Sequence, residues 1–178
     1  MGHAVVERDV FIEAMSRAVT GVTIVTTDGP AGQAGMTVSA MSSVSADPPT
    51  LLVCVNARSR TRTAIERNGV FCVNILGSSQ AAVADCFAGR NANATDRFAV
   101  GDWRPCTSGA PGLNGAVVRF DCRVHLSAAV ATHTVYFGQV IEATFDDCEP
   151  LLYWQRQYGL PLPSMDRASC ADAKGEDR

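Results

Sequence analysis

Hydroxyl side chains alternate with apolar ones along residues 35–45, and these residue types could hold a polar ligand. At the spacing of a β-strand, one face would carry Thr37, Ser39, Met41, Ser43 and Ser45, and all of these except Met41 have hydroxyl side chains. Small side chains also let a strand backbone approach a flat ligand, so that its N–H and C=O groups can bond heteroatoms along a ring edge. The alternative is an ordinary half-exposed strand whose Ser and Thr side chains face water.

A second candidate binding segment spans residues 56–61, where an apolar strand is expected to run into a helix. The free N–H groups of a helix N-terminus, the hydroxyls of Ser59 and Thr61 and the neighbouring arginines would together make an anion site. The alternative is that Ser59 only caps the helix and that the arginines are solvated.

Strands dominate the elements that must position these segments. Residues 22–27 are β-branched and end at a turn signal, Asp28-Gly29-Pro30, which predicts a hairpin with the hydroxyl-rich segment. Further strands are expected at the following ranges: 51–56, 70–76, 116–126 and 134–144. About six strands joined mostly by short links predict a closed or nearly closed antiparallel barrel, because closure removes exposed edges. The fold class is therefore mainly β with short helices.

Short helices are expected between the strands. One begins at Asp9 as its cap and carries an apolar stripe that includes Val10 and Met15, and another, residues 60–68, ends at Gly69. A helix capped by Ser78 should run to about residue 88, and a last one is possible at residues 151–158. The long connection 89–115, rich in Gly, Asn and Pro, is a candidate ligand cover.

Size and composition predict one globular domain, residues 1–165, followed by a polar and mobile tail, residues 166–178. Fifteen basic and eighteen acidic residues give a net charge of −3, which argues against a nucleic-acid or membrane-surface partner. We see no signal peptide or membrane span, so we expect a cytoplasmic protein. Seven scattered cysteines without a C-x-x-C pair indicate reduced thiols and no metal site. Rossmann, P-loop and serine-hydrolase motifs are also absent.

An ordered series of segments resembles the short-chain flavin reductases, the reductase components of two-component flavin-dependent aromatic monooxygenases. The segments that carry the resemblance are residues 21–27, 35–40, 43–45, 48–49, 56–61, 71–76 and 96–98. The resemblance implies an FMN-binding split barrel of Greek-key-like topology, as a homodimer. It implies reduction of FAD or FMN by NADH, with FAD favoured, and diffusion of the reduced flavin to a separate oxygenase acting on an aromatic or phenolic compound.

The resemblance also implies which residues bind the flavin. Those expected along the isoalloxazine are Thr37, Val38, Ser39 and Ala40, with Ser43, Val44 and Ser45 nearby. Those expected at the phosphate are Asn56, Ser59, Arg60 and Thr61, and Phe87 and Arg97 would flank the phosphate or adenine side. Arg97 could instead pair with Asp96 or Asp102, and Trp103 is either a lid residue or ordinary core packing.

His133 occupies the position at which many members of the family carry a histidine near the nicotinamide of NADH. Those members have Gly-Asp-His, whereas this chain has Ala131-Thr132-His133, so the acidic neighbour is missing. The alternative is a partly exposed polar residue at the start of a strand. We see no basic cluster for a 2′-phosphate, which favours NADH over NADPH. The alternative function is a protein of the same fold that binds flavin tightly and transfers electrons or senses redox state.

Overall fold

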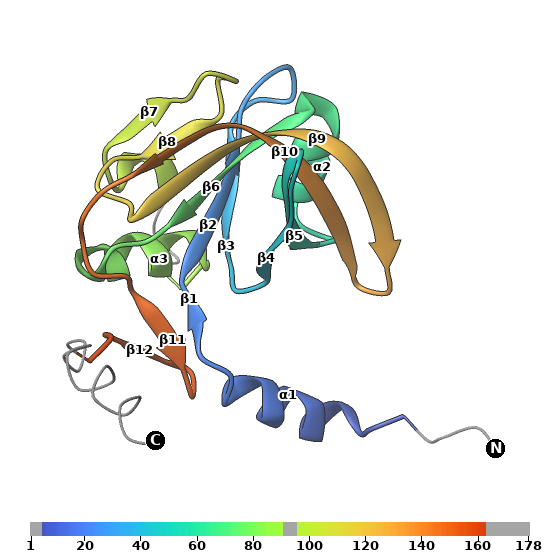
Figure 1. Ribbon diagram of the computed structural model, residues 1–178. Coiled ribbons are helices and arrows are strands. Elements are labelled where there is room, and N and C mark those ends of the chain that lie inside the picture. The colour runs from blue at the N-terminus through green and yellow to red at the C-terminus, as the bar shows by residue number, and fades with distance from the viewer. Residues whose placement is uncertain (1–4, 91–95, 163–178) are drawn as a thin grey trace, which may run out of the picture.

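The computed structural model describes residues 5–90 and 96–162, and its main element is one antiparallel sheet of seven strands (Figure 1). The strands follow the order β3-β2-β6-β9-β10-β5-β4 across the sheet. Their bounds are β2 Thr23–Thr27, β3 Ala34–Val38, β4 Met41–Ala46, β5 Pro49–Asn56, β6 Val70–Ile75, β9 Val118–Val130 and β10 His133–Phe145. The mainly β, antiparallel class expected from the sequence is confirmed, including the hairpin of β2 and β3.

Of the two predicted forms, a closed or a nearly closed barrel of about six strands, the structure shows the nearly closed one. The sheet has seven strands, and its two edge strands, β3 and β4, are not paired with each other. These edge strands are nevertheless consecutive in the chain, joined by Ser39 and Ala40 alone. A link of two residues spans less than about 11 Å, so the two edges of the sheet must come close together. The sheet therefore curls into a barrel that stays open between β3 and β4.

The prediction of one continuous strand over residues 35–45 is also wrong. The chain leaves the ladder with β2 after Val38 and joins the ladder with β5 at Met41, so the alternation of faces is interrupted at Ser39 and Ala40. Thr37 and the serines of β4 consequently lie on opposite edges of the sheet. The local pattern of hydroxyl and apolar residues continues through this break, and only the pairing partners reveal it.

Two helices pack beside the barrel, and sequence signals predicted both. α2, Arg60–Asn68, begins at Ser59, whose hydroxyl accepts a hydrogen bond from Arg62 N, and ends at Gly69 with a left-handed φ of 71°. α3, Ala81–Phe87, follows a 3₁₀ turn, η1 Ser78–Gln80, so this helical segment starts after Gly77 and not at a Ser78 cap. The barrel core includes Phe71, Val73 and Tyr136, and a second core lies under α3 around Ile24, Leu76 and Phe87.

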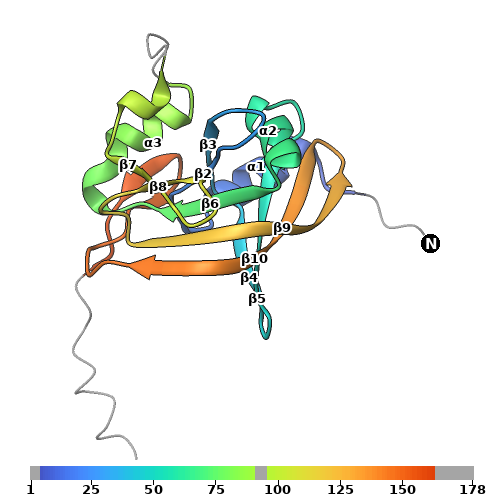
Figure 2. The same ribbon diagram turned by 90° about the horizontal axis from the view of Figure 1, so that it is seen from above.

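The connection expected over residues 89–115 contains regular structure. It forms a short 3₁₀ helix, η2 Arg97–Ala99, and a hairpin of β7, Trp103–Pro105, and β8, Pro111–Leu113. The hairpin lies against the end of β6 (Figure 2), where Leu113 N donates to the buried Asn74 Oδ1 at 2.7 Å. Residues 91–95 lie outside the described part of this connection.

The helix expected at residues 151–158 is wrong, because these residues form a hairpin. β11, Leu152–Trp154, pairs with β12, Gln157–Gly159, and with the short strand β1, Thr20–Gly21. Gln155 and Arg156 make the turn with positive φ values of 46° and 63°. The predicted tail, residues 166–178, lies outside the described residues.

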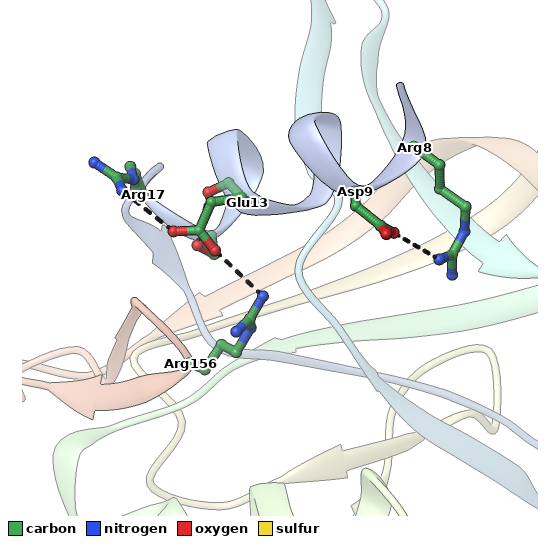
Figure 3. Close-up of polar contacts among 6 residues, drawn as sticks. Arg8, Asp9, Glu13, Arg17 and Arg156 are labelled. Carbon is green, nitrogen blue, oxygen red and sulfur yellow. Dashed lines mark hydrogen bonds and ion pairs between the residues drawn. The ribbon is translucent and has the colours of Figure 1, made fainter. Parts of the chain in front are cut away.

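The first helix, α1 Arg8–Ser16, projects from the body and buries none of its residues (Figure 1). Its N-cap is Glu7 without a side-chain hydrogen bond, so the predicted Asp9 cap is wrong. Polar contacts attach its C-terminal end to the β11–β12 hairpin, where Glu13 pairs with Arg17 at 3.3 Å and with Arg156 at 3.5 Å (Figure 3). The apolar stripe is therefore exposed in the single chain. Among the described residues, no helix is both long and apolar enough to span a membrane.

Candidate functional site

The larger of two cavities beside β3 has a volume of about 460 Å³, within the range of about 300–1,000 Å³ for small-molecule sites. It lies between the first residues of β3, the N-terminus of α2 and the end of α3. Five of the residues predicted to bind the flavin line it: Ser59, Arg60, Thr61, Phe87 and Arg97. The tertiary structure thus brings together the expected phosphate segment and the two residues expected to flank it.

The α2 end of this cavity has the features of an anion site. A helix leaves its first backbone N–H groups without intrahelical partners, and the dipole of the helix favours negative charge there. Ser59 serves as the helix cap, which was the alternative interpretation, and its hydroxyl also donates to Asn56 O at 2.8 Å. Arg60 is exposed at the cavity, whereas Arg62 pairs with Glu66 at 2.7 Å. Backbone N–H groups, Arg60 and Thr61, which also lines the cavity, are therefore the candidate anion ligands at this end.

Arg97 joins two walls of the larger cavity. Its Nη1 donates to the carbonyl oxygens of Gly35 and Phe87, each at 3.3 Å, and the described contacts of Arg97 include neither Asp96 nor Asp102. Asp96 instead accepts from Phe98 N, and Asp102 pairs with Arg104. Arg97 thus places a positive charge in the cavity while fixing β3 against the end of α3.

An aromatic cluster supports the same wall. Phe87 is 1% exposed and packs edge-to-face on Phe98, with ring centroids 5.0 Å apart. Trp103 lies 5.0 Å from Phe87 and donates from Nε1 to Val100 O at 2.8 Å. Trp103 therefore packs as part of the core, which was the alternative to a lid.

The smaller cavity, of about 220 Å³, lies at the other end of β3, and Ala88 lines both cavities. Thr37, Val38 and Ser39 line it, as do Tyr153 and Tyr158 from the β11–β12 hairpin. The Thr37 hydroxyl donates to Ala84 O at 2.8 Å, so it is already engaged within the protein.

Arg90 and two tyrosines close the smaller cavity on its outer side. The Arg90 guanidinium donates to Tyr153 Oη and to Asp85 Oδ1, both at 3.0 Å, and Tyr158 Oη donates to Asp85 Oδ1 at 2.7 Å. Burial and the bond to Asp85 raise the pKa of Tyr158 to about 12, so its hydroxyl stays protonated. Sequence reasoning missed both tyrosines because their segment was predicted to be helical. Their aromatic side chains are typical of strands, which is the signal that could have found them.

His133 lies outside both cavities, at the start of β10 and directly opposite Asn56 of β5. The ring is exposed, and its Nδ1 lies 3.0 Å from the Thr132 hydroxyl. The threonine thus supplies a hydrogen-bonding neighbour at the position where the resemblance implies an acidic residue. Asn56 Oδ1 accepts from Arg58 N at 2.9 Å, which shapes the turn that leads into α2.

The remaining predicted residues divide between the β3–β4 link at the barrel opening and strand β4. Ala40 lies at the opening, and its carbonyl accepts from Cys54 N at 3.0 Å. Cys54 belongs to β5 and lies opposite Val135 of the neighbouring strand β10. Ser43, Val44 and Ser45 lie on β4, exposed and outside both cavities, and the Ser45 hydroxyl bonds to the backbone of Asp47. The structure of the single chain therefore does not bring these three residues to the cavities beside β3.

The open antiparallel barrel, with paired cavities along an edge strand and an anion site at a helix N-terminus, defines a flavin reductase-like split barrel. The family model described as flavin reductase like domain matches residues 15–160, and the chain belongs to this family.

Relatives and solved structures agree with this assignment. The chain is 45% identical over 170 residues to a protein of Methylorubrum extorquens named FMN reductase (NADH) RutF 1, covering 95% of this chain and 84% of that one. The NADH:FAD oxidoreductase SgcE6 of Streptomyces globisporus C-1027, solved with NAD and FAD fragments, superposes with a TM-score of 0.83 at 31% identity over 90% of this chain and 96% of its own. The styrene monooxygenase flavin reductase of Pseudomonas putida S12 gives a TM-score of 0.75 at 29% identity, over 86% and 99%.

Proposed function

We propose that this protein is an NADH-dependent reductase of free flavins that accepts both FMN and FAD. The observation that carries the proposal is the larger cavity, where the N-terminus of α2, Arg60 and Arg97 supply positive charge beside the free edge of β3. A flavin phosphate carries the negative charge that such a site favours. The relative of 45% identity is named for FMN and NADH, and the SgcE6 structure for NADH and FAD.

Backbone groups are the expected isoalloxazine ligands in this proposal. The opening between β3 and β4 leaves Ser39 and Ala40 exposed, and the hydroxyl of Thr37 is engaged by Ala84. Fixed N–H donors at the ring edge would stabilise the negative charge that a flavin gains when hydride from NADH reaches N5. Hydride transfer depends chiefly on proximity and orientation, so no residue of the chain is assigned as an obligatory acid.

We assign His133 to the binding of the nicotinamide. Its exposed ring stands on the strand next to β5, whose end leads into the proposed phosphate site. The Thr132 hydroxyl can hold the ring in one orientation by hydrogen bonding to Nδ1. This is the role expected of the acidic residue that this chain lacks.

We further propose that the reduced flavin is released to a separate monooxygenase that acts on an aromatic compound. The resemblance to reductase components and the likeness to the styrene monooxygenase flavin reductase support this partner class. Because NADH is made and consumed inside the cell, we expect the reaction to take place in the cytoplasm.

A homodimer is the expected assembly. α1 exposes more than half of Val10, Phe11 and Met15, and a helix with a contiguous apolar face generally packs against a partner. A second copy of the chain is the partner that the resemblance implies.

Steady-state oxidation of NADH, followed by its near-ultraviolet absorbance with and without added FMN or FAD, tests the proposal. Turnover that saturates with free flavin is expected, with NADPH as the weaker donor. Flavin that stays bound without turnover would instead support the electron-transfer alternative, and a protein that binds no flavin would contradict both functions.

A further inference from the structure

Two cysteines with no part in the proposed flavin reaction lie against each other although they are 34 residues apart in sequence. Cys72 is fully buried in β6, and Cys106 is half-buried in the turn between β7 and β8. Their sulfur atoms are 3.7 Å apart and share a hydrogen bond. The sequence contains no C-x-x-C pattern, so this pair arises only from the way the β7–β8 hairpin folds against β6.

The approach of the two thiols is anchored by polar contacts of the residues that follow Cys106 in the hairpin. Leu113 N donates to Asn74 Oδ1, and the backbone N–H and hydroxyl of Ser108 both donate to the buried carboxylate of Asp121. Gly112 provides the space for the thiol, because a Cβ at that position would lie 2.7 Å from Cys106 Sγ. The hairpin therefore holds Cys106 in a defined position beside Cys72.

Cys106 is also accessible to a small reagent. It lines a cavity of about 70 Å³ together with Arg119 and Glu142, and a site needs only about 10–15 Å³ to admit a water molecule. Hydrogen peroxide has only one oxygen atom more than water, so the cavity can admit it.

The surroundings give the two thiols different reactivity. The hydrogen bond shared with Cys72 lowers the pKa of the Cys106 thiol, with help from the Arg119 charge, and it outweighs the opposing effects of burial, Asp121 and Glu142. The hydrogen bond with Cys106 and burial raise the pKa of Cys72 well above its usual value. The thiolate is the reactive form of cysteine, and Cys106 lines the cavity whereas Cys72 is fully buried, so Cys106 is the nucleophile and Cys72 the retained thiol beside it.

We propose that Cys72 and Cys106 form a peroxide-sensitive site that closes to an intramolecular disulfide. The Cys106 thiolate attacks one oxygen of hydrogen peroxide, the O–O bond breaks, and the products are a sulfenic acid and hydroxide, which takes up a proton to become water. The Cys72 thiol then loses its proton as its sulfur attacks Cys106 Sγ, and the S–O bond breaks to release a second water. Two thiols have lost two electrons and two protons, and one peroxide has become two waters.

The disulfide requires only a local movement. Its sulfur atoms must approach by about 1.7 Å, from their present 3.7 Å to a bonded separation of about 2.0 Å. The bond would attach the hairpin of Trp103, which packs on Phe87 in the wall of the larger cavity, to β6 in the interior of the sheet.

The physiological source of oxidant rests on the proposed function, because free reduced flavin reacts with oxygen to give hydrogen peroxide. The site itself does not rest on it, and added peroxide tests the cysteines without any flavin or NADH.

The test treats the full-length reduced protein with a small excess of hydrogen peroxide, blocks free thiols and determines its mass and its tryptic map without reduction. We expect two fewer blocked thiols than in the reduced control and a link between peptides 68–90 and 98–119 that dithiothreitol reverses. Peptide 68–90 also contains Cys86, so the map is repeated with Cys86→Ser, which should retain the link.

The variants Cys106→Ser and Cys72→Ser separate the two steps of the reaction. Cys106→Ser, in the half-buried turn, should abolish the link, whereas Cys148→Ser, an exposed matched control, should leave it unchanged. In Cys72→Ser the reaction should stop at a sulfenic acid on Cys106 that dimedone traps. Oxidation of Cys106 without a link in the wild-type protein, a link to any other cysteine, or no reaction of Cys106 would each overturn the proposal.

Discussion

Several hydroxyl and amide groups expected to bind the flavin are used by the protein to shape its own backbone. Ser59 caps α2, Asn56 accepts from Arg58 N in the preceding turn, and Thr37 bonds to α3. These residues fix the positions of the N–H groups around the cavities. At the residue scale, the charged and exposed side chains are therefore the ones whose removal should affect ligand binding directly.

Arg60 is one of these side chains. Because a hydrogen bond to a charged group contributes about 1.5–3 kcal/mol, we expect Arg60→Gln to raise the KM for FMN by about tenfold or more. Riboflavin has no phosphate, and its KM should stay nearly constant. Steady-state kinetics with both flavins measures the difference.

Arg58→Gln is the matched control, since Arg58 is exposed and lies outside the larger cavity. An equal loss of affinity for riboflavin and FMN in Arg60→Gln would contradict the phosphate assignment.

His133 gives a second prediction at this scale. Loss of one hydrogen bond to the nicotinamide costs about 1 kcal/mol, so His133→Ala should raise the KM for NADH about fivefold and change kcat less than about twofold. Thr132→Ala should produce a smaller change of the same kind, because it removes the Nδ1 partner. His125→Ala, which removes an exposed histidine from β9, is the control. Unchanged NADH kinetics in His133→Ala would remove the role.

At the scale of elements, the cavities depend on how closely β3 approaches α3. A Cβ built on Gly35 would lie 2.7 Å from the Phe87 ring and 3.1 Å from the Thr26 side chain. A glycine at this position lets the strand and the buried aromatic ring pack in contact. Arg97 then bonds to the carbonyls of both residues.

We therefore expect Gly35→Ala to lower the free energy of unfolding by about 1–3 kcal/mol, as overpacking of a core does. It should also weaken flavin binding, since β3 and Phe87 both line the larger cavity. Denaturant unfolding and fluorescence titration with FMN measure the two effects. Gly159→Ala, where an added Cβ meets no atom within 4 Å, should change neither. Full stability in Gly35→Ala would show that the strand shifts without cost.

The elements also show how far local sequence signals reach. Ser59 and Gly69 mark the ends of α2 by their side-chain cap and left-handed φ, and these local devices are readable in sequence. The segment 152–159 was misread because its fold depends on pairing with β1, more than 130 residues earlier in the chain. Pairing over such a separation leaves no periodic pattern in either segment.

At the scale of the whole molecule, the single chain leaves apolar surface uncovered on α1. Phe11 is 56% exposed and Met15 53% exposed, while the polar contacts of the helix attach only its far end to the β11–β12 hairpin. Burial of such side chains in an interface is favourable by about 25 cal/mol per Å² of apolar surface. We expect the second copy of the homodimer to supply that cover.

Light scattering should accordingly give the mass of two chains, and Phe11→Asp should raise the dissociation constant of the dimer by more than about tenfold. Arg8→Gln, on the same exposed helix, is the control and should leave the dimer intact. A monomer at micromolar concentration in the wild-type protein would contradict the expected assembly.

The sequence by itself determined the strand-rich class, the β2–β3 hairpin, the limits of α2 and, through an ordered series of motifs, the family. Each of these depends on residues close together in the chain: β-branched runs, turn residues and helix caps. Only the tertiary structure decided that residues 35–45 divide between opposite edges of an open sheet, and that Tyr153 and Tyr158 reach the smaller cavity. It also decided that Cys72 meets Cys106. These features depend on which distant segments pack together, and that choice is made by the free energy of the whole fold.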